Sequence, residues 1–255
     1  MHLRRLGAGR RVALALHCSL AHGGAFQGLA AALPGATLVA PDLPGHGQSA
    51  DWDGRADYAT LATRQALEVA AGLGPCDLIG HSFGAVIALR MALEVPEAFA
   101  SLTLIEPVLF AAARAAGSPR HAEHLARQAP FEAALRAGDR VAAARAFTAI
   151  WGTGVDWDAM TDRSKDEAVR RIHLIAATES AVTEDSGGLL LPWRLEALGL
   201  PVLLVEGALS PPVIGAVHDE LARRLPQVGR VVVPGAGHML PITHPFAVAG
   251  AMGWG

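Results

Sequence analysis

The sequence contains few lysines, few cysteines and no long apolar run, and each shortage excludes a class of protein. Lys165 is the only lysine among 21 basic residues, and 24 acidic residues give a net charge of −3, so nothing favours nucleic acid or an anionic membrane. The two cysteines, Cys18 and Cys76, are too few for a disulfide framework and have no structural-zinc spacing. No apolar run approaches the ~18 residues that span a bilayer. We expect a cytoplasmic protein with no membrane or nucleic-acid partner.

What the sequence does have is a globular composition, with 51% hydrophobic and 18% charged residues, and a regular alternation of two patterns. Short, mostly apolar runs are typical of parallel strands that are covered on both faces. Longer helical patterns separate these runs, so the sequence predicts an α/β protein with a doubly wound, mostly parallel sheet. The predicted strands span 12–16, 37–40, 77–79, 102–105, 202–206 and 230–233, and the predicted helices span 25–33, 58–72, 85–94 and 217–225.

Residues 111–193 interrupt this alternation. They are rich in Ala and Arg, have a helical pattern and are divided by glycine-containing breaks. Because the segment begins and ends inside the α/β pattern, we expect a helical cap inserted at 111–193 into a core formed by 1–110 and 194–255. A separate domain is the alternative.

The strongest chemical signal is the pentapeptide at 80–84, Gly-His-Ser-Phe-Gly, which follows one predicted strand and opens a predicted helix. This strand–turn–helix context is the one in which a G-x-S-x-G motif presents a nucleophilic serine. We therefore predict that Ser82 is a nucleophile. The backbone N–H of Phe83, at the start of the helix, is a candidate donor to a developing oxyanion.

A serine nucleophile needs a general base, and His238 is the candidate. It lies in a Gly-rich loop after the last predicted strand, so the loop reaches the sheet edge where Ser82 is expected. Taken alone, it would be an ordinary loop histidine. A second oxyanion donor is expected from the backbone N–H of Ser19, which follows the first predicted strand at the same edge; an ordinary loop is the alternative.

These motifs together resemble the α/β-hydrolase-fold serine hydrolases with a helical cap, over nearly the whole chain. The segment His17-Cys18-Ser19 resembles the family's His-Gly-x oxyanion loop, with Cys18 where Gly is usual. Residues 42–49, Asp-Leu-Pro-Gly-His-Gly-Gln-Ser, resemble the family's D-x-P-G-x-G-x-S loop at the rim of the active site, where His46 is expected to support the loop. The resemblance implies an α/β-hydrolase fold.

The chain departs from the family pattern at the acid of the triad, because Ser210 occupies the position where an aspartate is usual. We predict that Glu106 replaces it. Glu106 ends the predicted strand 102–105, some members of the family place the acid there, and the order Ser82, Glu106, His238 matches the fold. Two alternatives are open: Glu106 caps the loop to Pro107 and has no catalytic role, or the site is a Ser-His diad without an acid. Glu206, Asp219 and Asp185 are less suitably placed.

Several other residues are weaker candidates for a role in binding a substrate or a metal. Cys18, Trp151 and Met239 are candidate substrate-binding residues, because they lie in the cap or beside the candidate catalytic residues. The alternative for Cys18 is a structural role as a small buried residue, and the alternative for Trp151 is packing within the cap. His121 and His124 have helical spacing but lack a third ligand, so we expect a solvated face of the cap and no metal site.

The expected function is a cofactor-free serine hydrolase that cleaves a carboxylic ester or related acyl bond in a small-molecule substrate. Epoxide hydrolases and haloalkane dehalogenases of this fold use an Asp nucleophile, which the motif at Ser82 excludes. A C–C bond hydrolase, a lactonase, a thioesterase, a perhydrolase-like enzyme and an acyltransferase share the Ser-His pair and stay open. A non-catalytic small-molecule receptor on the same fold is the alternative of a different class.

Overall fold

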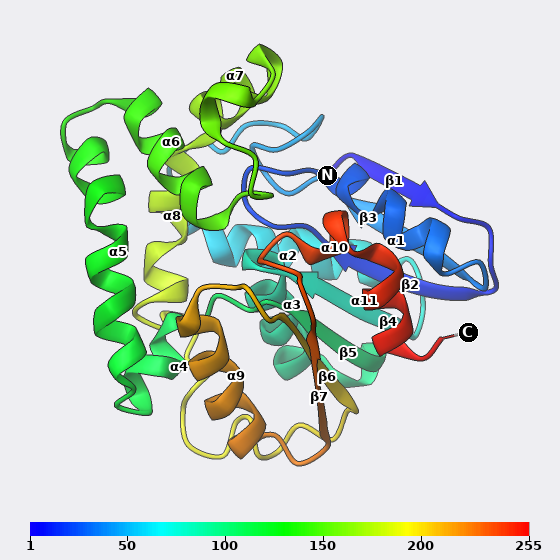
Figure 1. Ribbon diagram of the computed structural model, residues 1–255. Coiled ribbons are helices and arrows are strands. Elements are labelled where there is room, and N and C mark those ends of the chain that lie inside the picture. Colours follow the sequence, from blue (N-terminus) through cyan, green and yellow to red (C-terminus); the bar gives the residue numbers. More distant parts are fainter. Residues whose placement is uncertain (255) are drawn as a thin grey trace.

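A seven-stranded sheet forms the centre of the protein in the computed structural model, which describes residues 1–254 (Figure 1). The strand order is β1-β3-β2-β4-β5-β6-β7. Only β1 is antiparallel to its neighbour, so the predicted mostly parallel α/β sheet is confirmed. The strands are β1 (Leu3–Leu6), β2 (Arg11–Leu16), β3 (Ala36–Pro41), β4 (Cys76–His81), β5 (Phe99–Ile105), β6 (Val202–Gly207) and β7 (Val228–Val233).

Helices cover both faces of the sheet, which explains why its inner strands are apolar throughout. Neighbouring residues of one strand enter different cores: Leu78 belongs to the larger apolar cluster and Ile79 to the other. The first face is covered by α2 (Tyr58–Ala71), α3 (Phe83–Glu94), α4 (Phe110–Ala115) and α9 (Pro212–Arg224), and the second by α1 (Gln27–Ala32), α10 (Leu240–Thr243) and α11 (Pro245–Met252).

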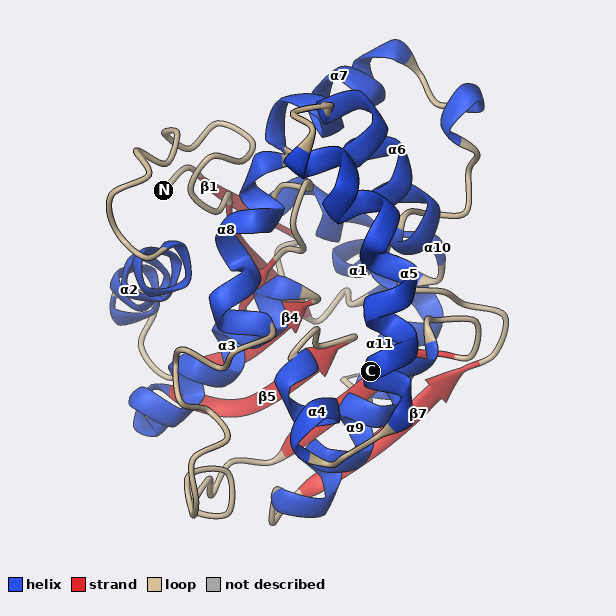
Figure 2. Cartoon of the chain, turned by 90° about the vertical axis from the view of Figure 1, so that its left-hand side faces the viewer, coloured by secondary structure: helices blue, strands red, loops and turns tan. Residues whose placement is uncertain are grey.

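The chain between β5 and β6 contributes a group of helices at one end of the sheet (Figures 1 and 2). After α4 come α5 (Pro119–Arg136), α6 (Arg140–Trp151), α7 (Asp162–Arg171) and α8 (His173–Val182). The side chains of Ser118, Asp139 and Thr161 accept hydrogen bonds from backbone N–H groups at the starts of α5, α6 and α7, as N-cap residues do. The inserted helices also share a small core of their own, formed by Phe131, Ala143, Ala144, Ala168, Ile172 and Ile175.

The six predicted strands are all present, but three short elements at the ends of the chain were not predicted from the sequence. Strand β1 has the sequence Leu-Arg-Arg-Leu, and its residues are half-buried or exposed at the edge of the sheet. Helices α10 and α11 follow the histidine loop and pack against α1. Helix α9 begins at Pro212, before the predicted start at 217. None of the helices described in residues 1–254 is long and apolar enough to cross a membrane.

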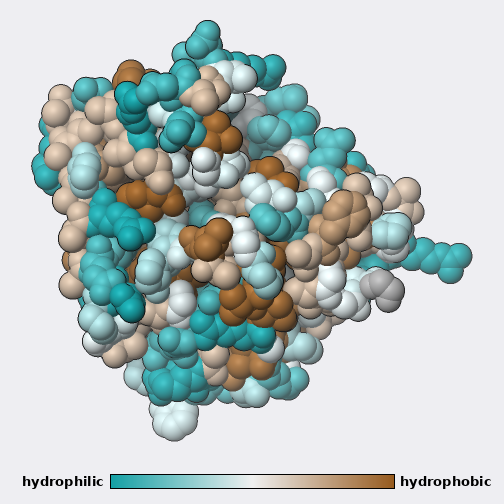
Figure 3. Space-filling view, viewed as in Figure 1, coloured by the Kyte–Doolittle hydropathy of each residue, from teal (hydrophilic) through white to brown (hydrophobic). Residues whose placement is uncertain are grey.

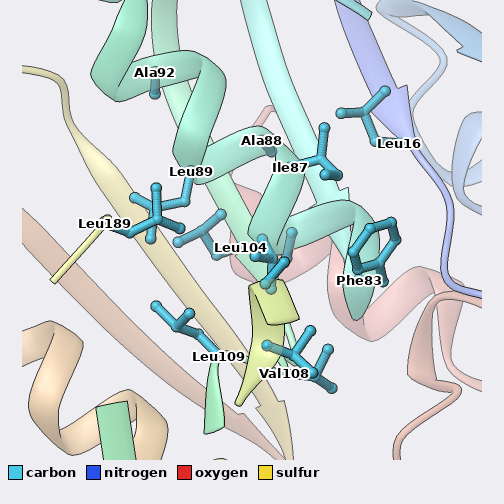
Figure 4. Packing of buried hydrophobic residues seen from close by; sticks show 14 of the residues in the cluster. Leu16, Phe83, Ile87, Ala88, Leu89, Ala92, Leu104, Val108, Leu109 and Leu189 are labelled. Carbon is cyan, nitrogen blue, oxygen red and sulfur yellow. The ribbon is translucent and has the colours of Figure 1, made fainter. Parts of the chain in front are cut away.

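Helix α3 lies very close to the sheet, and Gly84 makes this possible. A Cβ added at Gly84 would lie 2.2 Å from the carbonyl oxygen of Leu16 in β2, which is backbone and cannot rotate away. With the helix this close, Phe83 and Ile87 are fully buried near Leu16 and Leu104 (Figure 4). The position of Ser82, one residue before α3, therefore depends on a residue without a side chain.

We expect Gly84→Ala to lower the free energy of unfolding by about 2 kcal/mol or more, because the methyl group would push α3 away from β2. Urea denaturation followed by circular dichroism measures the change. Gly199→Ala is the matched control, since a Cβ there would have no atom within 4 Å. Equal stability of the two variants would contradict the close approach of α3 and β2.

Candidate active site

Ser82 occupies the sharp turn between β4 and α3. Its φ angle of +56° is rare for a residue with a side chain and marks local backbone strain. The turn needs Gly80 because an added Cβ there would lie 2.4 Å from the Cα of Ala85. The strand–turn–helix context predicted for the pentapeptide is therefore present, and Ser82 is 7% exposed at the carboxyl end of β4.

His238 lies directly beside Ser82, although 156 positions separate them in the chain. The Ser82 hydroxyl lies 2.9 Å from Nε2 of His238. The backbone oxygen of His238 accepts a hydrogen bond from Nε2 of His81, at 2.8 Å, which fixes the loop that follows β7. Burial, more than the neighbouring His238, lowers the pKa of His81 to about 3, so His81 stays neutral as a donor. The Trp151 ring stands edge-on to the His238 ring, with centroids 4.7 Å apart.

Glu106 lies on the other side of the same imidazole. Its Oε2 is 2.9 Å from Nδ1 of His238, and its side chain is fully buried. The other carboxylate oxygen, Oε1, accepts hydrogen bonds from the Gly207 N–H at 2.7 Å and the Ser210 hydroxyl at 2.8 Å. Ser210, at the position of the family's usual aspartate, thus contacts the carboxylate that takes the aspartate's place beside His238.

The other carboxylates considered in the sequence are engaged elsewhere. Glu206 forms an ion pair with Arg230 and lies 3.1 Å from Nδ1 of His218, and Asp219 also pairs with Arg230. Asp185 accepts hydrogen bonds from backbone N–H groups at 189 and 190. Of the four candidates, only Glu106 is in contact with His238.

The loop that follows β2 is held beside Ser82 by His17. The Nε2 of His17 accepts a hydrogen bond from the Leu43 N–H at 2.9 Å, so Nδ1 carries the proton and donates to the Cys18 carbonyl oxygen at 2.7 Å. Burial lowers the pKa of His17 to about 3, which keeps this arrangement neutral. Within the described chain, the N–H groups of Ser19 and Phe83 have no hydrogen-bond partner. Both residues line the cavity that contains Ser82.

The comparison with protein families agrees with this geometry. Residues 14–245 match the family model described as alpha/beta hydrolase fold. The chain belongs to the α/β-hydrolase-fold family.

Relatives among curated proteins include esterases and lipases. The chain is 32% identical to the pimeloyl-[acyl-carrier protein] methyl ester esterase of Aeromonas hydrophila, over 95% of this chain and 94% of the esterase. It is 37% identical to lipase LipV of Mycobacterium tuberculosis over 113 residues, 43% of this chain and 42% of the lipase, so that match spans less than half of the relative.

Solved structures show the same fold. A thermophilic esterase from Thermogutta terrifontis has a TM-score of 0.73 at 21% identity, with 98% of this chain and 90% of the esterase covered. A 2-hydroxy-6-oxo-6-phenylhexa-2,4-dienoate hydrolase from Rhodococcus has a TM-score of 0.72 at 21% identity, with 95% and 89% covered. At this identity the likeness extends to the fold alone.

The family loop at 42–49 forms a hydrogen-bonded support for the site. Asp42 is fully buried, pairs with Arg4 through both carboxylate oxygens and accepts further backbone N–H groups. His46 accepts from the Leu20 N–H at 3.0 Å, and its Nδ1 lies 2.9 Å from the Pro44 carbonyl oxygen. Burial lowers the pKa of His46 to about 4. His46 therefore supports this loop of the α/β-hydrolase fold, as the sequence predicted.

Two hollows adjoin each other, and one of them contains Ser82. A cavity of about 80 Å³ contains Ser82, His238 and Cys18, and burial raises the pKa of the Cys18 thiol to about 12. A larger cleft of about 620 Å³ contains Met239 and opens between the inserted helices and α10, on the face shown in Figure 3. Trp151 lines both hollows. Of the three candidate substrate-binding residues, Cys18 and Trp151 therefore line the cavity that contains Ser82, and Met239 lines the adjoining cleft.

The expectation of a solvated face at His121 and His124 is wrong for His124. His124 is 6% exposed and packs against the Phe110 ring, with centroids 4.0 Å apart, at the wall of the smaller cavity. Sequence reasoning missed it because its burial depends on how α5 packs over α4, which the helical period alone does not show. Among residues 1–254, no group of three or more His, Cys, Asp or Glu side chains could hold a metal ion.

Buried neutral histidines predict that acid destabilises the protein. The pKa values of His17, His46 and His81 lie at about 3, 4 and 3, below the ordinary 6.5. Below pH 6.5 the unfolded chain binds protons that the folded chain does not, so the free energy of unfolding falls as pH falls. Each such imidazole contributes about 2 kcal/mol of this loss between pH 6.5 and 5.

Urea denaturation at pH 7 and pH 5 measures this loss. His81→Gln retains an N–H donor for the His238 carbonyl but cannot take up the proton, so its stability should fall less steeply with pH than that of the wild type. A wild-type stability that is flat between pH 7 and 5, or an identical slope in His81→Gln, would contradict the prediction.

Proposed function

We propose that the protein is a serine hydrolase that cleaves carboxylic esters through an acyl-enzyme intermediate. The observation that carries the proposal is the position of His238, which lies 2.9 Å from the Ser82 hydroxyl on one side and 2.9 Å from the Glu106 carboxylate on the other. This arrangement has the parts that nucleophilic catalysis by serine requires: a nucleophile, a base and a group that orients the base.

In the first half of the reaction, Ser82 Oγ attacks the ester carbonyl carbon while its proton passes to Nε2 of His238. The carbonyl oxygen becomes an oxyanion, and the backbone N–H groups of Phe83 and Ser19 are its proposed donors. The loss of one such donor typically slows a reaction of this kind by roughly 10²–10³. When the tetrahedral intermediate collapses, the bond to the leaving oxygen breaks and His238 gives that oxygen the proton.

In the second half, a water molecule attacks the acyl-enzyme and loses a proton to His238. The ester bond to Ser82 then breaks, the proton returns to Oγ and the carboxylic acid leaves. Glu106 accepts a hydrogen bond from Nδ1 throughout, so it holds the imidazole in the tautomer with a free Nε2 and stabilises its positive charge. His238 takes part in every proton transfer, with Ser82, the leaving oxygen and water as its partners, so the proposed reaction needs no cofactor or metal.

We assign residues 111–193 as a cap that covers the carboxyl edge of the core formed by 1–110 and 194–255. In open α/β folds this edge is where ligands bind. Cys18, Trp151 and Met239 line the hollows between the two parts and are the proposed contacts to a small ester-like substrate. The esterase and the lipase among the relatives support an ester as the substrate class.

A fluorophosphonate probe, followed by intact-mass measurement, tests the proposal. We expect one covalent adduct on the wild type, because His238 activates Ser82, and none on Ser82→Ala. Folding of both proteins is checked by circular dichroism. A folded wild type that forms no adduct would contradict the proposed function and favour a small-molecule receptor on the same fold.

A further inference from the structure

Two residues in the wall of the smaller cavity beside Ser82 have polar atoms without a hydrogen-bond partner. Nδ1 of His124 and Oε1 of Gln128 are shielded from solvent and have no hydrogen-bond partner within residues 1–254. Both residues line the cavity, and His124 is 6% exposed. Buried polar groups in folded proteins are nearly always paired, and leaving one unpaired is costly, so these two atoms need a partner that the chain does not supply.

The two side chains lie on one face of α5. The Trp151 ring lies between the His124 ring and the candidate catalytic imidazole of His238. His124 and Gln128 are four positions apart, which places them on the same side of the helix. The His124 ring lies 5.9 Å from the Trp151 ring, and the Trp151 ring lies 4.7 Å from the His238 ring. Ser82, His124 and Gln128 line one cavity, so a molecule seated at Ser82 lies beside the other two residues.

The charges around the cavity limit the group that could bind there. Glu132 and Glu179 line the same cavity, and no Lys or Arg of the described chain does. Burial lowers the pKa of His124 to about 4, so its ring is neutral at pH 7 and supplies no positive charge. A carboxylate or phosphate would be repelled, whereas an uncharged hydroxyl or carbonyl would find hydrogen-bond partners.

The volumes of the two hollows limit the size of the bound group. They also indicate which part of an ester, the acyl chain or the leaving group, occupies each hollow. A cavity of about 80 Å³ is roughly half the ~150 Å³ of an engineered protein cavity that binds benzene, so it holds a chain of only a few non-hydrogen atoms. The cleft of about 620 Å³ is far larger. Ser82 and His238 line the small cavity and not the large cleft, which adjoins the cavity at Trp151. The acyl group stays bonded to Ser82, so the small cavity suits the acyl chain, and the leaving group departs toward the adjoining cleft.

We propose that His124 and Gln128 form a specificity subsite that hydrogen-bonds an uncharged hydroxyl or carbonyl group on a short acyl chain. The inference rests on the proposed serine hydrolase function and names its substrate class: short-chain esters whose acyl part carries a neutral polar group. His124 and Gln128 select the substrate, and the covalent steps stay with Ser82 and His238.

Two esters of nearly equal shape test the subsite. The 4-nitrophenyl esters of 3-hydroxybutyrate and 3-methylbutyrate differ only in a hydroxyl or a methyl group on the same carbon. For each enzyme, the ratio of kcat/KM for the hydroxy ester to kcat/KM for the methyl ester is measured. Comparison of this ratio between enzymes cancels the different intrinsic reactivity of the two esters.

We expect Gln128→Met and His124→Phe each to lower this ratio by about tenfold relative to wild type, because the substrate hydroxyl loses its partner. His121→Phe is the matched control: His121 lies one turn earlier on α5, its Nε2 is also unpartnered, but it does not line the cavity. Its ratio should equal that of the wild type. An unchanged ratio in both subsite variants would overturn the inference and assign the two atoms to internal water.

A binding measurement separates the subsite from the catalytic proposal. Ser82→Ala cannot form the acyl-enzyme, so quenching of tryptophan fluorescence by the methyl esters of the same two acids gives their Kd values directly. Tighter binding of the hydroxy ester, with the preference lost in Ser82→Ala/Gln128→Met, supports the subsite even if the wild type hydrolyses neither ester. Equal Kd values for the two esters would contradict it, whatever the activity of Ser82.

Discussion

The fully buried carboxylate of Glu106, which no Lys or Arg of the described chain contacts, constrains the rest of the site. An ionised carboxylate in the protein interior is costly unless hydrogen-bond donors replace its water. Three donors do so here: the Gly207 N–H, the Ser210 hydroxyl and Nδ1 of His238. The first two come from the end of β6 and the loop directly after it, and the third comes from the loop after β7. The carboxylate at the end of β5 therefore joins two segments that lie 101 or more positions away from it in the sequence.

This requirement explains how the chain tolerates Ser at the position of the usual aspartate. Strand β5 lies between β4, which carries Ser82, and β6, which precedes Ser210. The N–H of Glu106 donates to the Val205 carbonyl oxygen at 2.9 Å, so the residue is fixed against β6 and its longer side chain can extend toward His238. Ser210 cannot carry the charge, but its hydroxyl stabilises the charge on Glu106. The carboxylate beside the imidazole thus comes from the neighbouring strand, and the imidazole contacts both Ser82 and Glu106.

Local sequence patterns predicted the parts of the structure that depend on short-range rules. The inner strands are apolar because both faces are covered, and the turn at Ser82 is marked by glycines at 80 and 84 that closely approaching backbone requires. The proximity of Glu106 and His238 was predictable because parallel strands end at one edge of the sheet and the chain order of the triad is known.

Features that depend on packing between distant segments were not predictable in the same way. Strand β1 is short and half-exposed, so its sequence has no distinct pattern. The burial of His124 and the contact of Trp151 with His238 arise where the inserted helices meet the core, and neither residue has a neighbour in sequence that reveals this. The cavity at Ser82 and the cleft beside it are formed by the same meeting of segments, which is why the sequence alone predicted an ester or related acyl bond but no particular substrate.

The most direct test of this account is the kcat/KM of Glu106→Gln for 4-nitrophenyl acetate, with Glu206→Gln as the matched control. Glu206 is one strand away and pairs with Arg230 instead of His238. The account predicts a loss of about 10³–10⁴ in Glu106→Gln, the order found when the acid of a serine triad becomes an amide, because the imidazole is then held in the wrong tautomer. Glu206→Gln should retain nearly full activity. Equal activity of the two folded variants would contradict the assignment of Glu106 as the partner of His238.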